Sequence, residues 1–280
     1  MSYNQDELQA PAWLNDAFFL TVLRESENDP TIELTRGCVL RPGTNKGDHY
    51  GSVMFRTTAS YRSNHSAKEK SIHLIMKTKP EAEGLKKDIL DDNKIFAIEI
   101  DMYRKTLPDI ARMLKDIGEE YKYPRFIYGA LAPQTILILE DISHQGWVMG
   151  DFIGTLDEMK PIVKNIAMLH AGSVMLASKN LLHQVDANGR HTDTIFLDYQ
   201  ICCWTSPVID LFSMLDIMAS QEVKDKHRSE LIYMYYQHYS TFLKRMGFGG
   251  KITTLLELQM ELMQHAALVV VGGWLDYLEL

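Results

Sequence analysis

Residues 194–200 read Thr-Ile-Phe-Leu-Asp-Tyr-Gln. The first four are β-branched or bulky and apolar, which predicts a buried β-strand. Asp198 follows directly, and a carboxylate at the exit of an apolar strand is costly to bury unless a cation neutralises it. A divalent metal is one such cation. An Asp that only caps the next turn is the structural alternative.

The residues before Asp198 predict a β-hairpin. Residues 181–183 (Leu-Leu-His) read as a short strand, residues 186–190 as a turn, and residues 194–197 as the returning strand. Asp198 then lies at the end of the second strand of this hairpin.

A second hairpin is predicted near the N-terminus, where a helix starting at Pro11 precedes strands at 33–40 and 52–61. The turn between these strands contains Gly43 and Gly47, and glycine lets a backbone approach a ligand closely. Their spacing matches neither of the common glycine-rich phosphate-binding motifs. A plain hairpin with turn glycines is therefore the alternative.

A lysine and a glutamate follow at positions that suit an ion pair. After a polar turn at 62–70, a third strand at 71–77 ends in Lys77. Twenty-two residues later, Glu99 lies beside the apolar stripe of a helix predicted over 93–105. An acid beside a buried face needs a cationic partner, and Lys77 is the candidate. The order hairpin, strand with Lys, helix with Glu is that of the N-lobe of kinases.

The middle of the chain predicts further helices and an acidic linker. Leu107-Pro108 should end the Glu99 helix, and a short helix follows at 109–117. Two strands run from Tyr123 to Leu139, and Glu140-Asp141-Ile142 come next. In a kinase, such a strand edge leading into a linker is the hinge whose backbone binds adenine.

The second half predicts a mainly helical region. A capping box at Thr155-Leu-Asp-Glu158 begins a long helix that reaches about Met175. His170 lies next to the buried face of that helix and is predicted to be a packed core histidine. Ser206-Pro207 starts the helices that continue to the C-terminus.

The composition limits the classes of protein to which the chain could belong. The chain has 280 residues and a formal charge of −8, which argues against nucleic acid or an anionic membrane as its main partner. Three cysteines give neither a disulfide framework nor a metal-binding spacing, as expected in a reducing compartment. The polar N-terminus shows no signal peptide, and the longest apolar run, 266–271, is too short to span a bilayer. A cytoplasmic protein is expected.

Several stretches, taken in order along nearly the whole chain, form a specific set. They are Pro11-Ala-Trp-Leu14, Pro42-Gly43 with Lys46-Gly-Asp48, Leu74-Ile-Met-Lys77-Thr, Phe96-Ala-Ile-Glu99-Ile, Leu137-Ile-Leu-Glu-Asp141, Leu169-His-Ala171, Phe196-Leu-Asp198-Tyr-Gln200, and Ser206-Pro207 with Asp210-Leu211. In these stretches the chain resembles the ecdysteroid kinase-like family of arthropods, which is related to choline kinase and the aminoglycoside phosphotransferases. None of the stretches would be specific alone.

The resemblance implies a bilobal, protein kinase-like α+β fold. A β-rich N-lobe would cover residues 1–140, and a mainly helical C-lobe, shortened relative to the family, would cover residues 141–280. The implied cofactors are ATP and Mg²⁺, and the implied acceptor is a hydroxylated, steroid-like or other small alcohol. The implied nucleotide-binding residues are Lys77, Glu99, Gly43, Gly47, Glu140 and Ile142, and the implied metal ligands are Asp198 and Asn180.

One expected part of the family pattern is missing. The family carries an H-G-D-x-W-x-N-N loop, whose Asp is the catalytic base and whose last Asn binds metal. If Asn180 is that Asn, the base position falls on Met175 and the His position on Ser173. His191-Thr-Asp193 spells H-x-D, but it lies in the hairpin turn, where the geometry is wrong for a base. A helical insertion of the C-lobe is also absent, and the end at Leu280 is early.

Two functional hypotheses follow. The first is an ATP-dependent small-molecule O-kinase that transfers a phosphoryl group to a hydroxyl, impaired in this chain because no catalytic base is identified. The second is an inactive pseudokinase, a nucleotide-binding module, or an incomplete isoform that lacks the catalytic loop.

Overall fold

A computed structural model describes residues 8–43, 52–79, 94–147, 154–179, 181–185, 191–196 and 206–275. The chain forms two compact units. The first unit consists of residues 1–105 and 123–149, and the second of residues 106–122 and 150–280. The predicted lobe boundary after residue 140 stays a prediction, and the fold class, a mixed α+β architecture with its sheet in the N-terminal part, is confirmed.

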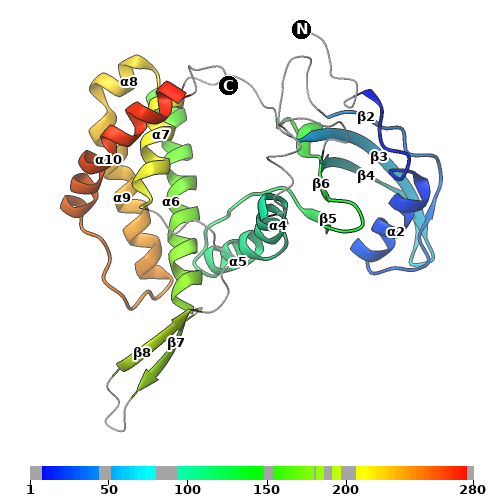
Figure 1. The fold of residues 1–280 in the computed structure, drawn as a ribbon, viewed down its shortest axis with the longest axis horizontal. Helices are drawn as coiled ribbons and strands as arrows, with labels where there is room; N and C mark the ends of the chain where they lie inside the picture. The colour runs from blue at the N-terminus through cyan, green and yellow to red at the C-terminus, as the bar shows by residue number, and fades with distance from the viewer. Residues whose placement is uncertain are drawn as a thin grey trace. The chain divides into compact units, whose positions relative to one another are not determined.

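The first unit is built on a six-stranded antiparallel sheet (Figure 1). The strand order is β1-β3-β4-β6-β5, and β2 also pairs with β3. The strands are β1 (Glu33–Leu34), β2 (Arg41–Pro42), β3 (Val53–Ser63), β4 (Ser66–Thr78), β5 (Phe126–Ala130) and β6 (Ile136–Glu140). The strand β4 is central, because it pairs with β3 on one side and β6 on the other.

Buried side chains alternate along the strands, so one face of the sheet is buried. Phe55 and Ala59 of β3 and Leu74 and Met76 of β4 are almost fully buried and form one core. The helix α2 (Asp16–Ser26) packs its apolar residues into the same core. This helix begins at Asp16, not at Pro11 as predicted, because the Asn15 side chain caps it by accepting a hydrogen bond from the Phe18 N–H.

Two strand predictions in this unit are wrong. The predicted strand at 33–40 is two short strands, β1 and β2, which pair with different parts of β3. The predicted turn at 62–70 is mostly strand, because β4 begins at Ser66 and only Asn64 and His65 form the turn. Residues 68–70 are all exposed, so this end of β4 lacks the apolar alternation from which strands are predicted.

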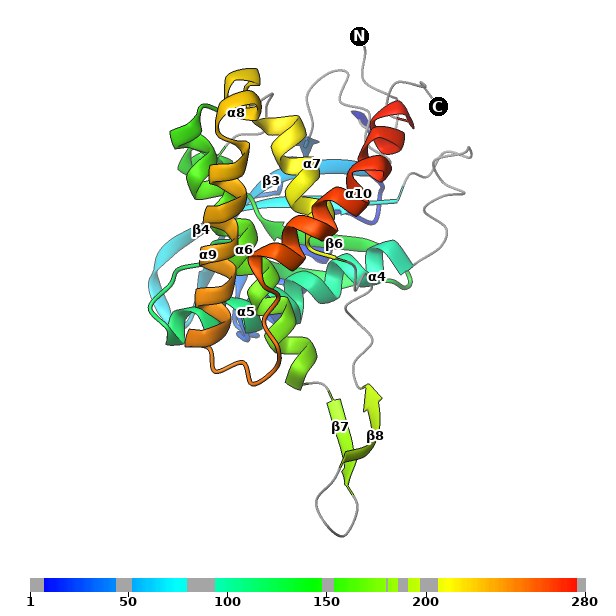
Figure 2. The ribbon, with the colours of Figure 1, turned by 90° about the vertical axis from the view of Figure 1, so that its left-hand side faces the viewer.

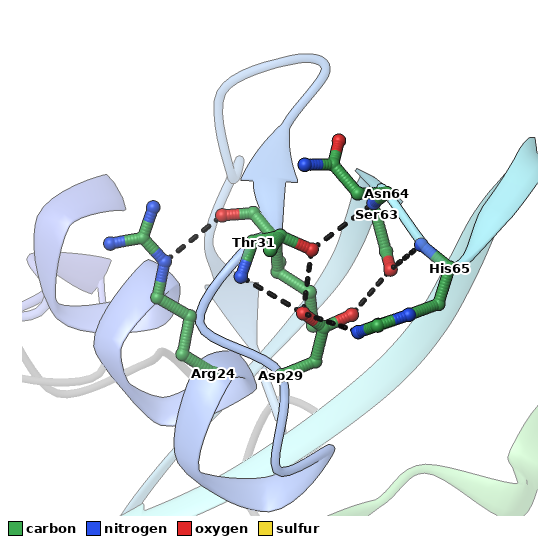
Figure 3. Close-up of polar contacts among 7 residues, drawn as sticks. Arg24, Asp29, Thr31, Ser63, Asn64 and His65 are labelled. Carbon is green, nitrogen blue, oxygen red and sulfur yellow. Dashed lines mark hydrogen bonds and ion pairs between the residues drawn. The ribbon is translucent and has the colours of Figure 1, made fainter.

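Asp29 anchors the β3–β4 turn to the end of α2 (Figure 3). Its carboxylate accepts hydrogen bonds from the Thr31 N–H at 2.9 Å, the Thr31 hydroxyl at 2.6 Å and the Ser63 hydroxyl. The His65 Nε2 lies 3.8 Å from the same carboxylate. The bonds from Ser63 and Thr31 hold the pKa of Asp29 at about 2, below its ordinary value of 3.8.

The Glu99 helix does not end at Leu107-Pro108 as predicted. The helix α4 (Lys94–Asp101) runs into a π-helical turn, η1 (Met102–Thr106), and then into α5 (Leu107–Asp116). Pro108 lies in the first turn of α5, so the helical stretch continues through it, and its missing N–H leaves a carbonyl of the preceding π-helical turn without a helical donor. The division between the two units falls inside η1.

The second unit is mainly helical. It contains α5, α6 (Leu156–Lys179), α7 (Val208–Met218), α8 (Gln221–Lys226), α9 (Arg228–Arg245), α10 (Leu255–Leu275) and the hairpin β7 (Leu181–Val185) and β8 (His191–Phe196). Figures 1 and 2 show α6 beside α9 and α10 beside α7. Residues of α5, α6, α7, α9 and α10 share one buried core. Within the described residues, no helix combines the length and apolar character needed to cross a bilayer.

The Glu158 side chain at the start of α6 makes its half of the predicted capping box. The Thr155 N–H and hydroxyl donate to the Glu158 carboxylate at 2.8 and 2.7 Å. Farther along α6, Gly172 lies against Ile110 of α5, and a Cβ added at Gly172 would lie 2.5 Å from the Ile110 Cγ2. The crossing of α5 over α6 therefore requires glycine at this position.

We expect the Asp29→Asn substitution to remove an acid-dependent part of the stability. The native carboxylate has a depressed pKa, so its contribution is complete above about pH 4 and is lost as the pH falls towards 2. In urea unfolding from pH 5 to pH 2, the difference in unfolding free energy between the native chain and the variant should shrink on acidification. Asp225→Asn, at an exposed site on α8, should give no such trend. A difference for Asp29→Asn that is constant with pH would contradict the assignment.

We expect Gly172→Ala to lower the free energy of unfolding by about 1–3 kcal/mol, because the new Cβ overlaps a branched side chain that cannot move aside. In an Ile110→Ala background the same change should be neutral or stabilising, since alanine favours the helix. Gly249→Ala, where a Cβ would meet nothing within 4 Å, should change stability by less than about 0.5 kcal/mol. Denaturant unfolding measures all of these values. An equal loss for Gly172→Ala in both backgrounds would exclude the Ile110 contact as the cause.

Candidate functional site

Lys77 and Glu99 meet as predicted. Lys77 lies on the central strand β4, between Met54 of β3 and Leu137 of β6. Its Nζ lies 2.6 Å from the Glu99 Oε2 on α4. The two side chains are 28% and 29% exposed, so the ammonium is restrained but still open to solvent.

The position of Lys77 follows from strand alternation. Leu74 and Met76 of β4 point into the core beneath α2, so Lys77 points to the opposite face of the sheet. Its Nζ also lies 5.7 Å from the centre of the Phe96 ring, which is fully buried. The carboxylate and the ring together limit the positions that the lysine can adopt.

The glycine-rich turn is described only at its start. The Gly43 N–H donates to the Met54 carbonyl at 2.7 Å, and a Cβ at Gly43 would lie 2.9 Å from the Met54 backbone. Close approach to β3 therefore already requires glycine at this position. Gly47 lies outside the described residues, and a ligand contact at either glycine stays a prediction.

The predicted hinge follows β6. The Glu140 N–H donates to the Arg125 carbonyl at 2.9 Å, and the Glu140 carboxylate lies 3.4 Å from the Arg125 Nε. The N–H and the side chain of Glu140 are thus both engaged within the first unit, and a contact of Glu140 with a base stays a prediction. Ile142 begins a 3₁₀ helix, η2 (Ile142–Gln145), which is capped by the Asp141 side chain.

Sequence reasoning missed a polar cluster beside this hinge. Arg56 of β3 lies on the same sheet face as Lys77, and its Nε lies 3.6 Å from the Asp141 Oδ2. This Nε is buried and makes no hydrogen bond among the described residues. A buried donor left in this way costs about 1–3 kcal/mol, so it calls for an explanation. The sequence signal that could have revealed this cluster is Arg56 itself. It lies on a strand between Phe55 and Thr57, which are both buried.

The two predicted metal ligands, Asn180 and Asp198, lie outside the described residues. The hairpin between them is described, with Leu181 paired to Phe196. The chain therefore enters and leaves the hairpin at the same end. The strands of the hairpin are longer than predicted. The strand β7 extends to Val185 and β8 begins at His191, so Asp193 lies in a strand and not in the predicted turn. Amide and carboxylate oxygens suit Mg²⁺. Within the described ranges, no group of three or more His, Cys, Asp or Glu side chains could hold a metal.

The predicted base position lies within a helix. The helix α6 extends to Lys179, and the Ser173 hydroxyl donates to the Leu169 carbonyl inside it. Met175 is 5% exposed and belongs to the core of the second unit. The alternative, Asp193, lies in β8, and its side chain is outside the described part. The described residues thus present no carboxylate at the position where the family has its base.

His170 is held in a polar network of the second unit, as expected for a packed histidine. Its Nδ1 lies 2.8 Å from the Tyr235 hydroxyl and its Nε2 lies 3.2 Å from the Asp210 Oδ2. The His170 contact lowers the pKa of Asp210, and burial raises the pKa of Tyr235 well above its ordinary value. These contacts join α6, α7 and α9.

A sequence model described as the ecdysteroid kinase-like family matches the chain over residues 46–179 and 176–248. No curated protein sequence matches the chain.

We expect the Lys77–Glu99 pair to add little to stability. A double-mutant cycle of Lys77→Met and Glu99→Gln should give a coupling of about 1 kcal/mol or less, because both side chains are partly exposed to solvent. The more exposed pair Lys226–Glu222 on α8 should give about 0.3–0.5 kcal/mol. Urea unfolding measures both. A coupling of several kcal/mol would mean that the pair is mainly a structural brace.

Proposed function

Because the chain belongs to the ecdysteroid kinase-like family, a family of kinase-like small-molecule phosphotransferases, we propose that it binds ATP with Mg²⁺. We further propose that its acceptor is a small hydroxylated, steroid-like molecule and that phosphoryl transfer to this acceptor is impaired. The observation that carries the proposal is the ion pair of 2.6 Å between Lys77 and Glu99.

The pair suits the binding of phosphate groups. Phosphoryl transfer requires positioning and charge neutralisation more than covalent chemistry by the protein. The Lys77 ammonium is held by a carboxylate on α4 and is open to solvent. It can therefore contact the α- and β-phosphates without first losing conformational freedom. Glu99 restrains this lysine, which is the role of the corresponding glutamate in kinases.

Asn180 and Asp198 are the proposed holders of the metal. They flank the hairpin of β7 and β8, in which residue 181 pairs with residue 196. Bound Mg²⁺ would neutralise the negative charge of the phosphates.

The proposed impairment of phosphoryl transfer is inferred from α6. A helix occupies residues 156–179, so a buried methionine stands at the base position inferred from the family pattern. A general base contributes about 10²–10⁴-fold to rate, and orientation of the acceptor can contribute about 7–11 kcal/mol. The family match also divides into two segments that meet at residues 176–179, which supports a missing family segment at this point.

A second candidate function is a nucleotide-binding pseudokinase without transferase activity. The buried position of Met175 favours it, because a methionine at the position inferred for the base cannot accept the proton of an alcohol. The two candidates share nucleotide binding and differ only in whether any transfer occurs.

We expect Mg·ATP to stabilise the native chain. At a free concentration 100 times the Kd, the stabilisation should be about 2.7 kcal/mol, seen as a rise in Tm. Lys77→Met should abolish this rise, whereas Lys70→Met, at an exposed position of the same strand, should keep it. Transfer of the γ-phosphate from labelled ATP to an ecdysteroid should stay at or near background.

Two outcomes separate the candidates, and two others would contradict the proposal. A rise in Tm with slow transfer supports the impaired kinase, and a rise without transfer supports the pseudokinase. Equal stabilisation of the native chain and the Lys77→Met variant would contradict the proposed site. No stabilisation of the native chain would contradict nucleotide binding itself.

A further inference from the structure

A compact polar cluster surrounds Asp141, the residue between the two predicted hinge positions. It comprises Arg56, His73, Asp141, Ser143 and His144 and is called here the Asp141 cluster. All five belong to the first unit. They come from β3, from β4 and from the segment that follows β6.

Every polar group of Asp141 is engaged. Its N–H donates to the His73 carbonyl at 2.9 Å, and its carbonyl lies 2.7 Å from the His144 Nδ1. Its Oδ1 accepts from the Ser143 N–H at 3.0 Å, and its Oδ2 faces the Arg56 Nε at 3.6 Å. With 9% of its surface exposed, Asp141 is fixed in position and orientation.

The partners of Asp141 are themselves linked. The Arg56 Nη1 lies 3.3 Å from the Ser143 hydroxyl, so the guanidinium holds both Asp141 and the first turn of η2. The His73 and His144 rings stack with centres 4.3 Å apart, and the His73 Nδ1 lies 2.9 Å from the Thr58 hydroxyl. The cluster therefore attaches the segment after β6 to two strands of the sheet.

The cluster leaves one backbone donor unused. Ile142 is the first residue of η2, so its N–H has no intrahelical acceptor, and Asp141 caps the N–H of Ser143 instead. Among the described residues, the Ile142 N–H donates to no other group. The Ile142 N–H immediately follows Asp141, whose N–H, carbonyl and two carboxylate oxygens all have partners.

We propose that Arg56 is a positioning residue for the nucleobase. It acts through Asp141 and Ser143 to hold the Ile142 N–H in place for an acceptor nitrogen of the base. This inference rests on the proposed binding of ATP, and it adds a residue outside the predicted site. The interaction of Arg56 is with the protein, so its loss should affect recognition of the base and not of the phosphates.

Binding of two probes tests this role. Calorimetric titration with Mg·ATP reports base and phosphates together, whereas Mg·tripolyphosphate reports the phosphates alone. We expect Arg56→Met to raise the Kd for Mg·ATP by about tenfold and to change the Kd for Mg·tripolyphosphate by less than about twofold. Ser143→Ala, a milder change, should raise only the Kd for Mg·ATP, by about twofold to threefold.

The matched control is Arg62→Met, which removes an exposed arginine from the same strand and should leave both affinities unchanged. If Arg56→Met does not fold, the Ser143→Ala variant decides the question by the same ratio. Equal losses for both probes, or no loss for Mg·ATP, would overturn the positioning role. A native chain that binds both probes equally well would also overturn it while leaving phosphate binding intact. A native chain that binds neither probe would overturn the proposed function as well.

Discussion

The ion pair between Lys77 and Glu99 is the constraint on which the functional interpretation depends. It joins a central strand to a helix on the opposite side of the sheet from α2, and its short N–O distance of 2.6 Å fixes where the ammonium lies. Because the pair is about a third exposed, its electrostatic contribution to folding is small. The ion pair therefore matters mainly because it holds a positive charge at a defined place. That is the requirement for binding a polyphosphate.

The sequence predicted this pair from two simple signals. Lys77 ends an apolar strand, and Glu99 lies beside the apolar stripe of a helix, so each needed a partner of opposite charge. The β7–β8 hairpin, the capping box at Thr155 and the packing of His170 were predictable for similar reasons, because local chemistry specifies them. The family followed from the order of many short stretches, and comparison confirmed it.

Other features could not be predicted because contacts distant in sequence determine them. The outer end of β4 has exposed residues on both faces, and its pairing with β3 alone makes it a strand. The polar cluster at Asp141 joins Arg56 and Ser143, which are 87 positions apart in the chain. Gly172 had no local signature either, since its role depends on Ile110 of another helix.

The helix α6 of the second unit occupies the position inferred for the catalytic base. The core of this unit continues through α6 to Met175, so the residues that would form a catalytic loop are packed as helix. Such packing favours folding of the unit and buries Met175 at the position inferred for the catalytic base. The Lys77–Glu99 pair lies in the other unit, and neither of its residues belongs to α6.

The most direct measurement is a crystal structure with Mg²⁺ and a non-hydrolysable ATP analogue. We predict the Lys77 Nζ within hydrogen-bond distance of the α- or β-phosphate, still paired to Glu99, with Asp198 on the metal. A nucleotide bound away from Lys77, or a metal that Asp198 does not contact, would contradict it.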